Sequence, residues 1–153
     1  MYIRNIFKRY KLNIEGNKIF DPIRKKYVAL TPEEVVRQQT IKFLLQRMKI
    51  PADRIGVECS LHSLGDLGNW KRVDICIYSP ADEIIAIIEC KADNYVACDS
   101  GFVQAIDYAE SLKVRNYFIV DCWDILGYHY VYERNQYDPI EEIPTYEQML
   151  QLA

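Results

Sequence analysis

Apolar residues recur along this chain at two different periods, and the change of period separates a predicted helix from predicted strands. After Thr31 and Pro32, apolar residues return every three or four positions until Pro51, as one buried face of a helix requires. Thr31 can cap this helix, Pro32 suits its first turn, and Glu34 stands where the acid of a capping box belongs. The pattern therefore predicts a helix that begins at Thr31 and ends before Pro51.

Shorter apolar runs after this helix indicate strands. The predicted elements are, in order, strands at 55–61, 72–78 and 84–90, a helix at 102–112, strands at 117–122 and 128–132, and a helix near 145–152. Short links between the first three strands favour an antiparallel meander, and the helix that follows permits a crossover to a parallel neighbour. We therefore predict an α/β fold class, with a mixed central sheet of about five strands flanked by helices.

The chain is expected to form a single domain. Its 153 residues are half apolar, which is enough to bury a core. Turn signals at Gly16-Asn17 and Asp21-Pro22 suggest short strands near the N-terminus. We expect an N-terminal basic arm over residues 1–30, a core over 31–133 and a C-terminal cap over 134–153.

Charge and cysteine content narrow the class of protein. The net charge of −3 argues against a protein that coats nucleic acid by bulk attraction, although residues 1–30 carry eight Lys or Arg against two acids. This arm either contacts phosphates or is simply solvated. The five cysteines have no metal-site spacing, and no apolar stretch is long enough to span a membrane. We therefore expect a cytoplasmic protein with reduced cysteines and no membrane partner.

Candidate chemistry comes from the hairpin formed by the second and third predicted strands. If residues 80–83 form its loop, residues equidistant from the centre of that loop face one another. The pairs are Tyr78 with Ile85, Cys76 with Ile87, Asp74 with Glu89, and Arg72 with Lys91. Opposed residues share a sheet face with Cβ atoms ~4.5–5.5 Å apart, and Lys91, two residues after Glu89, shares it too. Two carboxylates and an ammonium group should therefore meet.

Two opposed carboxylates repel each other unless a cation neutralises them. Mg²⁺ or Mn²⁺ would do so, because Mg²⁺ prefers oxygen ligands and is often held by one or two carboxylates. Lys91 could then orient or deprotonate an attacking water. A solvated salt-bridge cluster at the strand ends is the alternative, and a register slip of one residue would move Asp74 to the other face.

These residues also resemble a known motif. Asp74 followed by Glu89-Cys90-Lys91 is similar to the D…(D/E)xK signature of the restriction-endonuclease-like nuclease superfamily. Other blocks agree in order: Asp21-Pro22-Ile23-Arg24-Lys25-Lys26-Tyr27, Thr31-Pro32-Glu33-Glu34-Val35-Val36-Arg37-Gln38, Lys71-Arg72-Val73-Asp74-Ile75 and Gln104-Ala105-Ile106-Asp107-Tyr108. Over residues 12–133 the chain resembles the N-terminal nuclease domain of type I restriction enzyme R subunits. It resembles still more the short stand-alone bacterial proteins built from that domain.

The resemblance implies a three-layer nuclease core and a set of site roles. Asp74 and Glu89 would be metal ligands, with the Cys90 backbone carbonyl as a third ligand, and Lys91 would be the catalytic lysine. Glu34 matches an acid that lies near the metal, although it could equally be only a capping residue.

Further residues would contact DNA or support the site. Gln104 would act in catalysis or touch the nucleic-acid backbone, and Tyr108 on the same helix face would contact DNA or pack in the core. The remaining candidate DNA contacts are Arg37, Arg72, Lys25 and Lys26.

The primary hypothesis is a nuclease that depends on Mg²⁺ or Mn²⁺ and hydrolyses DNA phosphodiester bonds in restriction-modification or repair. One alternative is a non-catalytic nucleic-acid-binding or accessory subunit that keeps the fold. Another is a subunit that cuts only with a partner, such as a motor or specificity subunit of a restriction system.

Overall fold

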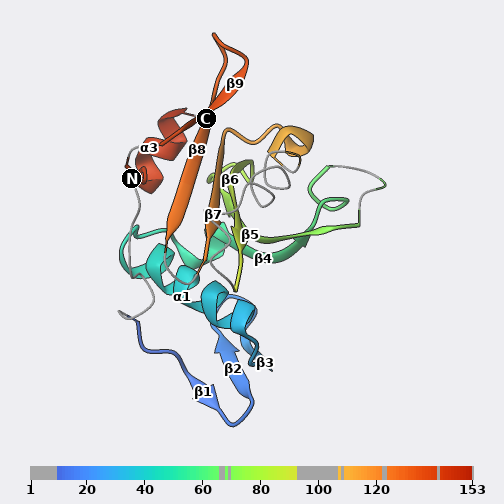
Figure 1. The fold of residues 1–153 in the computed structure, drawn as a ribbon, viewed down its shortest axis with the longest axis vertical. Coiled ribbons are helices and arrows are strands. Elements are labelled where there is room, and N and C mark those ends of the chain that lie inside the picture. Colours follow the sequence, from blue (N-terminus) through green and yellow to red (C-terminus); the bar gives the residue numbers. More distant parts are fainter. Residues whose placement is uncertain are drawn as a thin grey trace.

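The computed structural model describes residues 10–65, 68, 70–92, 107, 109–121, 124–140 and 142–152. A small antiparallel sheet contains β1 (Ile14–Glu15), β2 (Lys18–Asp21) and β3 (Lys26–Ala29). The large sheet contains β4 (Ile55–Ser60), β5 (Arg72–Tyr78), β6 (Ile84–Cys90), β7 (Asn116–Val120), β8 (Ile125–Val131) and β9 (Gln136–Pro139). The described part of the chain also contains helix α1 (Pro32–Gln46), the short 3₁₀ helix η2 (Ala52–Arg54) and helix α3 (Tyr146–Leu152) (Figure 1).

The strand directions of the large sheet follow the predicted topology. Strands β4, β5 and β6 form an antiparallel meander, and β6 then pairs in parallel with β7. Strands β8 and β9 continue the sheet in antiparallel fashion. The mixed α/β prediction is confirmed, but the sheet has six strands instead of about five.

The unpredicted strand and the early start of β8 have local explanations. Strand β9 contains Asp138 and Pro139, residues that are depleted in strands, and it lies at the sheet edge where they are tolerated. Strand β8 begins at Ile125, before the predicted start at Tyr128, and Gly127 lies inside it. A Cβ at this glycine would come within 2.8 Å of the Phe118 ring, so the glycine makes room for that ring.

The register of the central hairpin is as predicted except at its loop. Cys76 pairs with Ile87, but Tyr78 pairs with Ile84 and not with the predicted Ile85. A register shift between Ile77 and Tyr78 causes this difference. The shift lies near the loop, and the predicted register holds farther along the strands, from Ile77 with Ala86 to Ile75 with Ile88, next to Asp74 and Glu89.

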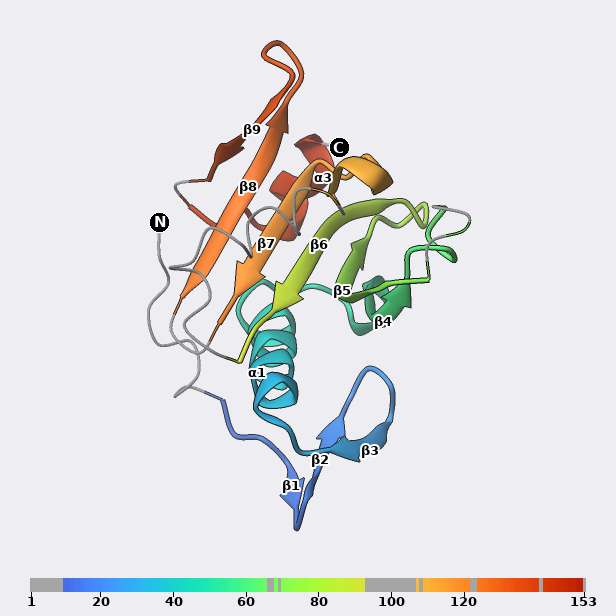
Figure 2. The same ribbon diagram turned by 45° about the vertical axis from the view of Figure 1, so that its right-hand side comes forward.

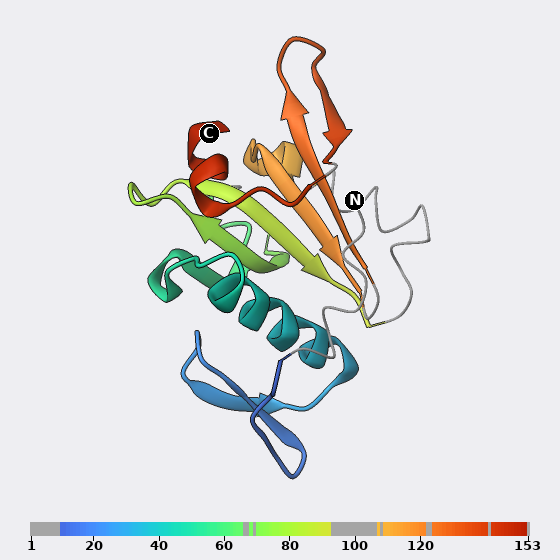
Figure 3. The same ribbon diagram turned by 90° about the vertical axis from the view of Figure 1, so that its left-hand side faces the viewer.

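Helix α1 lies between the two sheets, and its apolar side faces the large one (Figures 2 and 3). Val36, Ile41 and Leu44 pack with Ile77 of β5 and with Met149 of α3 in one core cluster. The opposite face of the sheet has a second cluster, which includes Ala109 in the helical segment 109–112. That segment falls within the predicted helix at 102–112, most of which lies outside the described residues. Strand β6 is therefore covered on both faces.

In the described part of the chain, no helix combines the length and apolar character needed to cross a bilayer.

Candidate active site

Three predicted site residues lie together at one end of the large sheet. Asp74 on β5 and Glu89 on β6 are only 6% and 5% exposed. Their carboxyl groups are close enough to interact directly. Lys91 follows β6, and its Nζ lies 3.9 Å from Glu89 Oε2. The structure thus brings together the two acids and the amine that the pairing of the hairpin predicts.

Asp74 is held by donors on both oxygens. The backbone N–H of Cys90 donates to Oδ2 at 2.7 Å, and Arg37 Nη2 donates to Oδ1 at 2.6 Å. Each carboxylate oxygen has two lone pairs, so both atoms keep acceptor capacity. These contacts fix the carboxylate without closing it to a further cation.

Arg37 on α1 is the centre of a buried ion-pair network. Besides Asp74, its guanidinium contacts Glu34, one turn earlier on α1, and Glu58 on β4 at 2.5 Å. Burial by itself would lower the pKa of Arg37, but the charges of Asp74, Glu34 and Glu58 outweigh it and raise that pKa. The side chain is 8% exposed, so this predicted DNA contact instead lies inside the protein.

Glu34 serves this network as well as the helix start. Its N–H donates to Thr31 Oγ1 at 3.1 Å, as a capping box predicts. Its carboxylate does not complete a capping box, but accepts hydrogen bonds from Arg37, from Arg24 Nη2 at 2.5 Å and from Gln38 Nε2 at 2.9 Å. Glu34 is therefore joined to Asp74 through the guanidinium of Arg37.

The small sheet supplies the other end of the network. Asp21, at the end of β2, accepts the N–H groups of Ile23 and Arg24 at 2.7 and 2.8 Å and the Arg24 Nε at 2.6 Å. Burial alone would raise the pKa of Asp21, but the hydrogen bonds from Arg24 outweigh it and lower that pKa. The turn thereby holds Arg24 against Glu34.

Three of the predicted DNA contacts are exposed. Lys25 and Lys26 lie at the β2–β3 turn, and both are exposed. The Arg72 side chain is 65% exposed and approaches Glu58 Oε2 at 3.5 Å. All three side chains remain available to a phosphate backbone.

Sequence reasoning missed two acids near the site, Glu33 and Glu58. Burial and the negative charge of Asp74 raise the pKa of Glu33, while Lys91 opposes this shift. Glu33, on α1, therefore interacts electrostatically with the site residues. The spacing of the capping box selects its neighbour Glu34 instead. Glu58 has a positive φ of 56° inside β4, a conformation that periodicity does not reveal.

Glu89 is a buried carboxyl group whose neighbouring cation, Lys91, does not offset the effect of burial. Burial, followed by the charge of Asp74, raises the pKa of Glu89 to about 9. Its Oε1 is buried and has no hydrogen-bond partner among the described residues. A buried oxygen without a donor is costly, and a divalent ion would satisfy it.

The donor set fits a hard divalent ion better than zinc. Among the described residues, no three Asp, Glu, His or Cys side chains converge on one point. Mg²⁺ does not need such a cage, because it usually keeps several waters and takes one or two carboxylates. Asp74 and Glu89 therefore fit Mg²⁺ or Mn²⁺, with remaining positions left for water or substrate oxygens.

The remaining predictions have different outcomes. Gln104 and Tyr108 lie outside the described residues. The Cys90 thiol is buried near Thr40 Oγ1, which agrees with a core cysteine, while its backbone carbonyl stays a predicted ligand.

The fold and this cluster define a mixed α/β domain with an acid–acid–lysine group at the end of a central strand. Comparison with family models identifies the family: the model of the type I restriction enzyme R protein N terminus matches residues 32–144. The chain belongs to this family, which confirms the resemblance. Comparisons with curated proteins and with solved structures gave no match.

Proposed function

We propose that this domain is a divalent-metal-dependent nuclease that hydrolyses DNA phosphodiester bonds in a restriction or repair system. The observation that carries the proposal is the meeting of Asp74, Glu89 and Lys91 in a member of a restriction-enzyme family. The fold supports a three-layer core of the restriction-endonuclease type. Restriction-system motor or specificity subunits are the proposed protein partners.

The proposed roles follow from the contacts of each residue. Asp74 and Glu89, with the Cys90 backbone carbonyl, would hold Mg²⁺ or Mn²⁺. Such an ion, when bound, activates water and neutralises charge that develops on the phosphoryl oxygens. Lys91 Nζ, beside Glu89, would orient the attacking water and accept or relay its proton.

Two further residues have supporting roles in the proposal. Arg37 positions Asp74 by donating to its Oδ1 and does not contact the substrate. Glu33 is exposed, and the charges of Asp74 and Lys91 affect its pKa. In the proposal it would bind waters around the ion.

A cleavage assay tests the proposal. The full chain should nick or cut DNA with Mg²⁺ or Mn²⁺ and should be inactive in EDTA. Asp74→Asn and Lys91→Met should each lower the rate by about 10²-fold or more, because each removes a metal ligand or a proton-handling group. Glu147→Gln, an exposed acid on α3, is the matched control and should cut like the natural chain. A chain that cuts nothing, or variants that cut equally well, would contradict the enzyme hypothesis.

One observation favours the alternative of a non-catalytic binding module. Asp74 already has a cationic partner in Arg37, so the cluster is partly neutralised without metal. In that case DNA binding should persist in EDTA and weaken with salt, and no cleavage should appear in either metal.

A further inference from the structure

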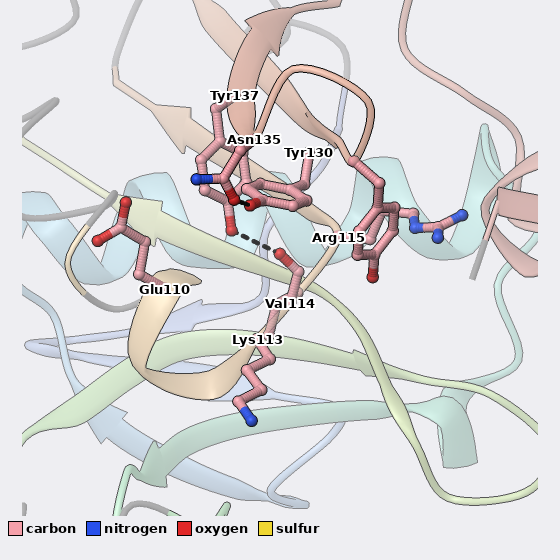
Figure 4. Close-up of a pocket in the computed structure, with 8 residues that line it drawn as sticks. Glu110, Lys113, Val114, Arg115, Tyr130, Asn135 and Tyr137 are labelled. Atoms are coloured by element: carbon pink, nitrogen blue, oxygen red, sulfur yellow. Dashed lines mark hydrogen bonds between the residues drawn. The ribbon is translucent and has the colours of Figure 1, made fainter.

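A second hollow lies at the opposite end of the large sheet from the candidate active site. Strand β6 runs parallel to β7, with Cys90 paired to Val120, whereas the hollow is built around Arg115, just before β7 begins. A strand of this length separates the two ends by about 16 Å. The cavity is about 440 Å³ and is lined by Glu110, Lys113, Val114, Arg115, Tyr130, Tyr132, Asn135 and Tyr137 (Figure 4).

Three tyrosine rings form fixed aromatic walls. The Tyr130 ring packs edge-on to Tyr132 at 5.0 Å and to Tyr137 at 5.1 Å between centroids. Tyr137 donates its hydroxyl to the Val114 carbonyl at 2.7 Å, and Tyr130 donates to the side chain of Asn135 (Figure 4). Tyr132 is 63% exposed, so this wall is open to solvent.

Two cations in the same hollow have no acidic partner in the described part of the chain. The Arg115 guanidinium lies 4.6 Å above the Tyr132 ring, and its Nε is buried without a hydrogen-bond partner. Neither Arg115 nor Lys113 forms an ion pair with any described carboxylate. A guanidinium held by a ring keeps its donors available for an anion.

We propose that this hollow binds a nucleotide unit, with the base against the tyrosine rings and the 5′-phosphate on Arg115, whose guanidinium lies beside the Tyr132 ring. The volume is within the range of small-molecule sites. Glu110 supplies base preference, because a carboxylate accepts two adjacent donors and guanine presents N1–H and an amino group side by side. The proposal does not depend on nuclease activity, since none of these residues belongs to the candidate active site.

Calorimetric titration of the full chain with deoxyguanosine 5′-monophosphate in EDTA tests the proposal. This nucleotide should bind at least tenfold more tightly than inorganic phosphate or deoxyguanosine alone, and more tightly than the adenine nucleotide.

Tyr132→Ala should weaken binding about tenfold through lost stacking, and Tyr132→Phe should not. Glu110→Gln should remove the preference for guanine, and Glu147→Gln should bind like the natural chain. Equal affinity for the nucleotide and phosphate, or no effect of Tyr132→Ala, would overturn the proposal.

The nucleotide unit could be free or part of a DNA strand, and a second titration separates these sources. A single-stranded thymine oligonucleotide with one guanine is compared with the free nucleotide. Tighter binding of the strand, weakened by Tyr132→Ala, identifies an unpaired base in DNA as the ligand. Tighter binding of the free nucleotide identifies a mononucleotide. Binding of neither overturns the proposal.

Discussion

Arg37 joins carboxylates from three different elements, so a single side chain links the charged groups behind the candidate site. Replacing it with methionine keeps the aliphatic stem but leaves Asp74, Glu34 and Glu58 without the cation they share. We expect Arg37→Met to lower the free energy of unfolding by about 3–5 kcal/mol, because breaking a buried ion pair leaves a buried charge without a partner. Urea denaturation followed by circular dichroism measures this loss.

Arg72 provides the control for Arg37. It also pairs with Glu58, but its side chain is mostly exposed and the contact is long. Arg72→Met should change the unfolding free energy by about 0.5 kcal/mol or less. If both variants were equally stable, the buried network would contribute no net stability.

Glu89 makes the metal response of the protein depend on pH. Its pKa in the fold is raised from 4.5 to about 9. The neutral carboxyl therefore contributes stability that is complete below pH 4.5 and is lost as the pH rises through about 9. A divalent ion must displace this proton, so metal affinity should rise with pH in the same interval.

Thermal unfolding with and without Mn²⁺ checks this pH dependence. The rise in melting temperature caused by Mn²⁺ should be larger at about pH 8.5 than at about pH 6. Glu89→Gln should respond weakly to Mn²⁺ at both values and should be more stable than the natural chain at high pH without metal. If Mn²⁺ raised the melting temperature equally at both pH values, Glu89 would not be the metal ligand whose proton the ion displaces.

At the scale of elements, helix α1 places Glu34 and Arg37 against the large sheet. Its first turn is fixed by Thr31, which accepts the N–H of Glu34. Thr31→Ala should lower the free energy of unfolding by about 1 kcal/mol, and Thr31→Ser should leave it nearly unchanged. The alanine variant should also reduce cleavage, because the helix start that carries Glu34 loosens. Equal stability of the two variants would show that the cap is unimportant.

The elements also show what the sequence could predict. The alternation along β5 and β6 and the short loop between them are local, so they place Asp74 opposite Glu89 without any knowledge of the rest of the fold. Strand β9 and the shift at Tyr78 have no such periodic signal.

Contacts between α1 and the sheet are equally hidden from the sequence. Arg37 meets Glu58 and Asp74 only because the core packs α1 against the sheet, and no spacing rule joins residues 21 and 37 positions apart. For this reason Arg37 looks like an exposed DNA contact in the sequence but is buried in the structure.

At the scale of the whole molecule, the net charge is −3, but the charge is unevenly distributed and the N-terminal arm is basic. Its exposed Lys25 and Lys26 project from the small sheet, which is tied to the site through Arg24 and Glu34. Replacing both lysines with alanine should weaken DNA binding and reduce its logarithmic salt dependence by about two, as loss of two phosphate contacts requires. Binding measured by fluorescence anisotropy across a salt series tests this. An unchanged slope would mean that the arm is only solvated.

Anomalous diffraction from a crystal of the full chain soaked in Mn²⁺ tests the central claim most directly. We predict a manganese peak in contact with Asp74 and Glu89, with Lys91 beside it, and no such peak in an Asp74→Asn crystal. A soaked crystal with no peak there, in which Arg37 alone neutralises Asp74, would contradict the metal-dependent account.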